Sequence, residues 1–344
     1  MFAKTADERL GEAIGKITAK KSEVGRLGTL TVPTEKGKSL IEHAIFRHDI
    51  LHNGRQYLTS SNEKDIDRID FRGKRVLTGF RGQDGKVKEE DYTDFNTHTN
   101  KIRGSRFKAE VMVTDDEIDS LGTEEDLVAF LEQKLYEKVL EEVESASVYS
   151  VQGEYVSGKP NMGLIDGYLN FVPKGNILYG KDSADTKVAA DVDLSTEEGV
   201  FNAIAKLVKT IEAPYRRKNK KSYAIYLPNE YKEMYEDYII ETKDSLLADK
   251  YLTGEMDETT YKGYKLIDVE SLYDAPNDEK AILFSLKSNF AHLFQINNIT
   301  LETQREFNRG WKIGTNFTFG VNFEDENAVS CILPDTQAPN APAE

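Results

Sequence analysis

The stretch from residue 107 to residue 163 constrains the fold more than any other part of the chain. Its sequence predicts a strand at 107–113, then a short acidic segment, then a helix from about Thr123 to Tyr149. A segment punctuated by glycines follows directly at 151–163. A helix of some 26 residues is a rod roughly 40 Å long. The order of strand and helix indicates that this one long helix packs across a sheet.

The predicted helix carries its own signals. Thr123 with Asp126 three residues later approximates a capping box, and Glu124 and Glu125 suit the positive end of the helix dipole. A row of apolar residues recurs at every fourth position: Leu127, Leu131, Leu135, Val139 and Val143. With its apolar neighbours the row covers roughly half the circumference, which is broader than a coiled-coil seam. A long amphipathic helix in any α/β protein would show the same pattern.

Length and composition limit the class of protein. A chain of 344 residues can bury a full core and hold two or three domains. With 39% hydrophobic and 31% charged residues it is expected to be soluble and folded. No apolar run approaches the ~20 residues of a membrane span, and the first residues lack an apolar signal-peptide core. The single cysteine, Cys331, rules out a disulfide framework and fits a reducing compartment.

The net charge of −15 argues against a protein whose whole surface grips nucleic acid. Solubility is the favoured explanation of this acidic balance, which would also suit a container wall that must not adhere to packed DNA. One strong basic cluster stands out at 215–221 and includes Arg216 and Arg217. We interpret it as a solvated turn between a helix and a strand, with contact to a phosphate or an acidic partner surface as the alternative.

The first 106 residues are too polar to build a compact core. Residues 1–55 hold one short amphipathic helix and then polar sequence, so they are expected to lie along a neighbour. Residues 56–106 are rich in glycine, and Asp84-Gly85 is a good hairpin turn signal. We therefore predict a long projecting hairpin.

The second half of the chain alternates helices with strands and ends in strands. Ser195 to Glu198 reads as a capping box for a helix at 196–211, and Asn229 as the cap of a helix that follows Pro228. Residues 167–191 are rich in turn formers. Strands are predicted at 222–227, 264–269, 281–286, 291–296, 300–307 and 311–323.

No motif for catalysis or metal binding withstands inspection. Gly37-Lys38-Ser39 would need a glycine at position 32 to close a phosphate loop, and Val32 is there. A calcium-loop start at Asp191 lacks its turn glycine and reads better as a helix cap. The five histidines show no zinc spacing. We therefore predict no catalytic, cofactor-binding or metal-binding residue, and no enzyme.

The order of these segments resembles that of HK97-fold major capsid proteins of tailed bacteriophages. Each motif is weak alone, and the likeness lies in their order and spacing over about residues 70 to 330. The similar segments are the strand and long helix, the proline–glycine stretch 159–165, the helix, basic turn and strand from 196 to 228, the glycine-led strand 262–270, and the closing strands 281–329.

The resemblance implies an α+β, HK97-like capsid fold with five parts. It would comprise an N-terminal arm (1–55), an extended β-hairpin loop (56–106), a peripheral domain (107–160 and 281–333, with spine helix 123–149), an axial domain (161–280) and a flexible tail (334–344).

The resemblance also implies a function. The chain would self-assemble into hexamers and pentamers of an icosahedral shell enclosing double-stranded DNA, without a cofactor. Its partners would be other copies of itself, a separate scaffolding protein, a portal, and DNA held non-specifically, with no membrane. It would be located in the virion capsid, after assembly in the host cytoplasm. Candidate inter-subunit contacts are Arg72, Lys74, Lys86, Lys88, Arg216 and Arg217.

Two alternatives stay open at this point. An encapsulin-like nanocompartment shell would share the fold, and a soluble α/β enzyme with a dispersed site belongs to a different class. Covalent locking of the shell is a further question, because Lys86 and Lys88 flank the hairpin tip while Asn316, Asn322 and Glu324 lie on or beside a closing strand. We favour lysines that only pair with carboxylates across subunits, each pair worth ~0–1 kcal/mol.

Overall fold

The computed structural model contains both helices and sheets, which confirms the α+β class. No helix in its described part is long and apolar enough to cross a membrane. The described residues are 28–31, 49–70, 96–121, 126, 130, 138–154, 156–159, 161–181, 192–211, 220–242, 259–273, 280–306 and 310–334.

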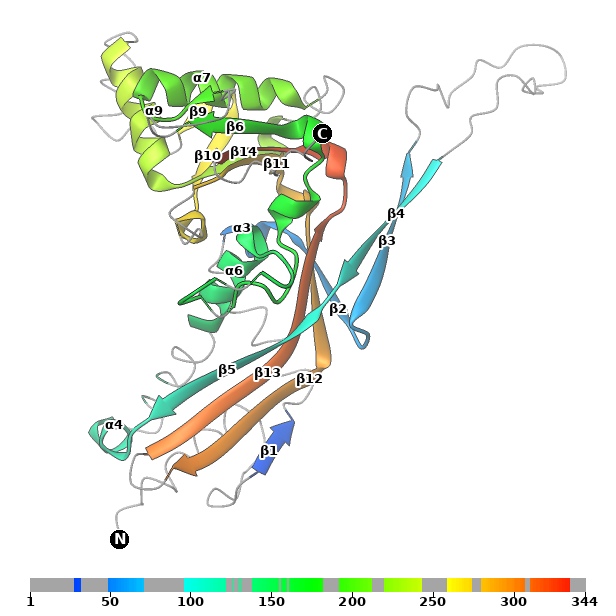
Figure 1. Cartoon of the computed structure of the whole chain (residues 1–344), viewed down its shortest axis with the longest axis vertical. Coiled ribbons are helices and arrows are strands. Elements are labelled where there is room, and N and C mark those ends of the chain that lie inside the picture. The colour runs from blue at the N-terminus through cyan, green and yellow to red at the C-terminus, as the bar shows by residue number, and fades with distance from the viewer. Residues whose placement is uncertain are drawn as a thin grey trace, which may run out of the picture.

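The first sheet is built on two long strands, β12 (Phe290–Glu306) and β13 (Gly310–Phe323), which pair antiparallel and run the length of the body in Figure 1. β5 (Ser105–Val113) flanks β13, and β1 (Gly28–Thr31) flanks β12. β2 (Arg55–Thr59) pairs parallel with the first part of β12. Segments from the start, the middle and the end of the chain therefore meet in one sheet.

The second sheet has seven strands in the order β7, β6, β14, β11, β8, β10, β9. Helices α7 (Glu197–Thr210) and α9 (Asn229–Thr242) lie over this sheet in Figure 1. Its strands are β7 (Val192–Asp193), β6 (Ile177–Lys181), β14 (Val329–Pro334), β11 (Ile282–Leu286), β8 (Tyr223–Leu227), β10 (Tyr264–Asp268) and β9 (Thr260–Tyr261).

A two-stranded hairpin projects away from both sheets (Figure 1). β3 (Glu63–Asp70) pairs antiparallel with β4 (Asn96–Arg103), from Glu63 opposite Arg103 to Asp70 opposite Asn96. Both strands lie within residues 56–106, where the sequence predicts an extended loop. The predicted turn at Asp84-Gly85 lies outside the described residues.

Short helices connect these sheets. α3 (Asp49–Asn53) precedes β2, and α4 (Asp115–Ser120) follows β5. The cap of α4 is a full capping box in which the Thr114 hydroxyl and the Glu117 carboxylate each accept a backbone amide of the other residue. This helix was not predicted, although Thr114 with Glu117 three residues later matches the pattern. Single 3-10 turns, labelled η, occupy Tyr168–Phe171, Lys174–Asn176, Lys220–Ser222, Glu270–Leu272, Lys287–Asn289 and Glu326–Ala328.

The predicted long helix is described in part. Asp126 and Phe130 are helical, and α6 (Lys138–Tyr149) forms the final turns. The remaining residues, with the Thr123 cap, lie outside the described part, so the full span stays a prediction. Residues 143–150 are buried on every side, polar ones included, which differs from the predicted one-sided apolar face.

Two large hydrophobic clusters fill the body, and both involve the seven-stranded sheet. One lies between that sheet and α7 and α9, and the face of α7 that is buried there is Val200, Ala203, Ile204, Leu207 and Val208. The other joins α6, β13 and the inner face of the seven-stranded sheet. Because this second cluster takes residues from both sheets, they share one continuous core. A small third cluster, Ile66, Ile102, Ala291 and Leu293, lies under the hairpin.

Several sequence predictions need correction. The strands predicted at 291–296 and 300–307 are one strand, β12, with a β-bulge between Gln295 and Thr300. The cap of α7 is Thr196, whose hydroxyl accepts the Gly199 amide, so the predicted Ser195 box is one residue out of register. Asn229 is already inside α9, and the Pro228 carbonyl accepts the Tyr231 amide.

Two strands within residues 281–333, β11 and β14, belong to the seven-stranded sheet. β11 and β14 pair with each other, and β11 pairs with β8 in the seven-stranded sheet. The strand β14 was not predicted at all, and neither was β6 within the turn-rich segment 167–191. The two long strands therefore carry the chain from one sheet to the other.

The strand that links the hairpin to the body crosses β13 at Gly320. A Cβ atom added at Gly320 would overlap the Arg103 carbonyl oxygen and approach the Gly104 Cα to 2.8 Å. Gly104 interrupts the path between β4 and β5, and its amide bonds to the Asn62 carbonyl at 2.7 Å. The direction of the hairpin therefore depends on a backbone crossing that only glycine allows.

We predict that Gly320→Ala destabilises the chain by about 1–3 kcal/mol, because the new methyl group must push two backbones apart. The measurement is urea unfolding of the unassembled chain. Gly175→Ala is the matched control, since a Cβ there meets nothing within 4 Å, and its stability should be unchanged or slightly higher. Equal stability of the two variants would show that the crossing is not tight.

Candidate inter-subunit surfaces

All six predicted contact residues lie outside the described residues: Arg72, Lys74, Lys86, Lys88, Arg216 and Arg217. The ends of the segments that carry them are described. Lys220, at the end of the basic cluster, donates to the Lys262 carbonyl at 3.0 Å and lies 5.6 Å from the centre of the Tyr264 ring. At least this part of the cluster packs on its own subunit, as expected of a solvated turn.

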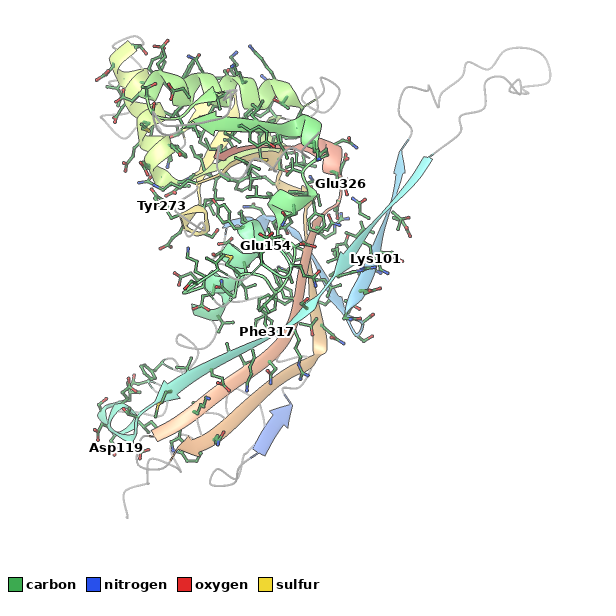
Figure 2. All side chains as sticks on the ribbon, in the orientation of Figure 1. Lys101, Asp119, Glu154, Tyr273, Phe317 and Glu326 are labelled. Atoms are coloured by element: carbon green, nitrogen blue, oxygen red, sulfur yellow. The ribbon has the colours of Figure 1, made fainter. Side chains whose placement is uncertain are left out.

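The hairpin root presents one polar face to solvent, near Lys101 in Figure 2. Glu63 on β3 pairs with Lys101 at 2.5 Å and with Arg103 at 3.3 Å across the ladder. The hydrogen bond from Lys101 lowers the pKa of the Glu63 carboxyl. Thr99 donates to Asp67 at 2.8 Å on the same face. These exposed contacts are worth little stability individually but keep the two strands in register.

Two asparagines fix the other side of the hairpin root to β13. The Asn100 amide donates to the carbonyls of Phe323 at 3.0 Å and Glu324 at 3.4 Å. In return the Asn322 amide donates to the Lys101 carbonyl at 3.0 Å. Because both donors are largely removed from water, losing either bond leaves a polar group unsatisfied. The root of the projecting hairpin is therefore held rigidly.

Glu324 ties β2 to the same corner. Its carboxylate accepts a hydrogen bond from the Tyr57 hydroxyl at 2.9 Å and forms an ion pair with Arg55 at 2.8 Å. The hydrogen bond with Tyr57 and the negative charge of Glu324 together raise the pKa of Arg55, and burial raises the pKa of Tyr57. This contact was not predicted from the sequence, because Tyr57 and Glu324 are 267 residues apart.

The residues considered for covalent locking do not form one reaction centre. Asn316 and Asn322 are six residues apart on β13, a separation of roughly 20 Å along a strand. The Asn322 amide group is engaged twice, since its oxygen also accepts the Phe323 amide at 2.7 Å. Glu324 is occupied by Tyr57 and Arg55. Attack on Asn322 would have to displace two hydrogen bonds within its own subunit.

A second charged group lies on the outer face of the first sheet. Glu110 on β5 pairs with Lys108 and with Lys312 of β13, each at 2.7 Å. Hydrogen bonds from these two lysines, that from Lys108 first, lower the pKa of the Glu110 carboxyl. The pair with Lys312 joins two strands and helps to maintain their register, whereas the pair with Lys108 lies within β5, and together they do not amount to a chemical site.

Chemistry has little support in the described part of the chain. No group of three or more potential metal ligands occurs there. Asp193 accepts the amide and the hydroxyl of Ser195, at 2.9 and 2.6 Å, which supports its interpretation as part of a helix start. Cys331 is fully buried, and burial raises the pKa of its thiol, so it is not a reactive nucleophile.

Comparison with known proteins gives a fold but no close relative. No protein-family model matches the sequence, and the comparison with curated proteins gave no match. Among solved structures, a chain of the satellite phage P4 procapsid aligns with TM-score 0.58 and 11% identity, covering 94% of this chain and 97% of that one. A chain of the native GTA particle capsid aligns with TM-score 0.51 and 14% identity, covering 91% and 93%.

This chain has the HK97-like fold of phage capsid proteins. The likeness covers nearly the whole of both chains, so the capsid fold is not confined to one domain. At 11–14% identity it establishes the fold alone. A chain of the SrpI encapsulin complex from Synechococcus elongatus also aligns, with TM-score 0.44, 11% identity and 84% and 88% coverage, and this weaker score decides nothing between the two kinds of shell.

Proposed function

We propose that this chain is a major capsid protein that self-assembles into hexamers and pentamers of an icosahedral shell enclosing double-stranded DNA. The observation that carries the proposal is the alignment with the P4 procapsid chain over 94% of this chain and 97% of the other. An enzyme with this fold would be expected to carry an added catalytic segment. Because the alignment covers nearly all of both chains, little of this chain remains for such a segment.

The geometry of the hairpin supports a role between subunits. Its root is fixed by Asn100, Asn322 and the Gly320 crossing, so its direction is set by its own subunit. An isolated two-stranded hairpin is marginal in water and needs a surface to cover it. We propose that it is the extended loop, that it lies on a neighbouring subunit, and that its lysines and arginines (Arg72, Lys74, Lys86 and Lys88) pair there with carboxylates.

The remaining parts follow the same scheme. Residues 1–55 would be an arm along a neighbour, 107–160 with 281–333 the peripheral domain, and 161–280 the axial domain, with the strands β11 and β14 contributing to the axial sheet. Arg216 and Arg217 would contact an adjacent copy. A separate scaffolding protein and a portal complete the partners, DNA is held non-specifically, and the shell is assembled in the host cytoplasm.

Expression of the full chain followed by electron microscopy tests the proposal. We expect closed shells or rings of five and six subunits, because every copy carries the same projecting hairpin and the same receiving surface. Particles that copurify with an enzyme instead of nucleic acid would identify a nanocompartment. A compact monomer at all concentrations, with or without a scaffolding protein, would contradict shell formation.

The hairpin should gain protection only on assembly. Amide hydrogen exchange of the hairpin at 70–106 is expected to be faster in unassembled subunits than in particles at positions away from its fixed root, since a neighbour then covers them. α7 serves as the internal control, because its buried face is already covered within the subunit. Equal hairpin protection in the two states would mean that no neighbour contacts it.

We expect the shell to be held together without covalent bonds. The reason is that Asn322 is engaged by hydrogen bonds within its subunit and lies roughly 20 Å from Asn316. Denaturing gel electrophoresis of mature particles should give a single monomer band. A ladder of multiples that disappears in Asn322→Asp or Asn316→Asp would show that lysine attack does occur.

A further inference from the structure

The root of the N-terminal segment is held by a carboxylate from another part of the chain. Glu144 Oε1 on α6 accepts the backbone amides of Ile50 at 2.9 Å and Leu51 at 3.3 Å. Ile50 and Leu51 are fully buried, and Glu144 is only 3% exposed. α3 and α6 lie side by side at the centre of Figure 1. The amide end of α3 is thus capped by a residue 94 positions away.

A histidine closes the other side of the same segment. The imidazole of His292 on β12 is fully buried against Gly54, so closely that a Cβ atom on Gly54 would overlap Nε2. The carbonyl groups of Ile50 and Leu51 also lie close to this ring. Nε2 makes no hydrogen bond of ordinary geometry within the described part of the chain. Such an unsatisfied buried atom in a tightly packed site calls for an explanation.

Tyr168 is hydrogen-bonded to the histidine and lies within the electrostatic influence of the carboxylate. Its hydroxyl lies 2.6 Å from His292 Nδ1 and 3.2 Å from the Ala291 carbonyl oxygen. Burial, followed by the negative charge of Glu144, raises the pKa of Tyr168, so the hydroxyl keeps its proton. Glu144 and the hydrogen-bonded pair Tyr168–His292 are therefore buried polar groups beside residues 49–54.

The closed site favours a neutral imidazole. Burial lowers the pKa of His292 from 6.5 to about 3, against the opposing effect of the Ile50 and Leu51 carbonyls. Tyr168 is the titratable group hydrogen-bonded to the ring, and Glu144 and Tyr226 act electrostatically on Tyr168. Further charged or titratable side chains on or beside the elements packed against it are at least partly exposed, among them His52, Arg55, Tyr57 and Glu324.

We propose that Glu144, Tyr168 and His292 form an acid-sensitive clamp on residues 49–54, closed while the imidazole is neutral and opened when it takes up a proton. Opening frees α3 and Gly54 from α6 and β12, and with them the root of everything that precedes β2. If the chain is a capsid protein, as proposed above, the clamp controls whether the arm is fixed or free to move along a neighbour.

The direction of the effect follows from linkage. An open, hydrated His292 has its ordinary pKa of 6.5, whereas the closed one has a pKa of about 3. Above both values the ring is neutral in either state, and the clamp is at its most stable. Between them only the open state binds a proton, so each unit of falling pH favours opening about tenfold. From about pH 7.5 to about pH 4.5 the opening constant should rise close to 100-fold.

Hydrogen exchange on the full, unassembled chain measures this opening directly. Rates for residues 49–54 are compared at the two pH values after correction for intrinsic amide exchange, with α7 as the reference. We expect a rise close to 100-fold in the wild type and none in α7. In His292→Asn, whose side-chain amide can still pair with the Tyr168 hydroxyl, most of the rise should be lost. His52→Asn removes an exposed histidine from α3, the helix whose exchange is measured, and should keep the full rise.

An equal rise in wild type and His292→Asn overturns the clamp, and so does full protection of residues 49–54 in the wild type at the lower pH. If His292→Asn does not fold, histidine-labelled wild-type chain decides by NMR. A neutral His292 signal is expected at about pH 5 while the clamp is closed, and a protonated ring beside a protected segment would refute the mechanism. Shell formation plays no part in these measurements, so the clamp and the capsid proposal can fail separately.

Discussion

The antiparallel ladder between β12 and β13 is the interaction on which the rest of the structure depends. It runs from Phe290 opposite Phe323 to Glu306 opposite Gly310, with a single bulge. At one end its aromatic residues pack on Tyr168, and the chain then passes from each strand into the seven-stranded sheet. Along its length it offers edges to β1, β2 and β5. Removing this ladder would leave the hairpin without the strand to which it is bonded, and α3 without its contact to β12.

Buried polar contacts fix the orientations of segments that apolar packing alone does not fix. At the passage between sheets, the Asn289 side chain accepts the Asp325 amide at 2.7 Å and donates to the Asp325 carbonyl at 3.0 Å. Asn322 does the same for the hairpin, and Glu144 for α3. Apolar packing tolerates small rotations, whereas an unsatisfied buried amide or carboxylate costs about 1–3 kcal/mol or more. A shell subunit needs such fixed directions, because its projecting segments must reach the same place on every neighbour.

The elements set by local pattern were predictable, and the contacts between distant segments were not. The stripe of α7 and the strands β8, β10 and β11 follow from apolar spacing within a few residues. The polar pair Asn297-Asn298 concealed the continuity of β12, because a bulge between Gln295 and Thr300 lets one strand continue through it. Glu144 and His292 carry no local signal, since their partners lie 94 and 124 residues away. The basic residues predicted as contacts lie outside the described residues.

An electron cryomicroscopy structure of the assembled particle tests the central claim most directly. If the account is correct, residues 63–70 and 96–103 of each subunit will lie on an adjacent copy, while the bonds from Asn100 and Asn322 remain within the subunit. The arm will leave the body at α3 beside Glu144. A hairpin folded back onto its own subunit, with the asparagine bonds broken, would contradict the idea that its direction is built into the fold for reaching a neighbour.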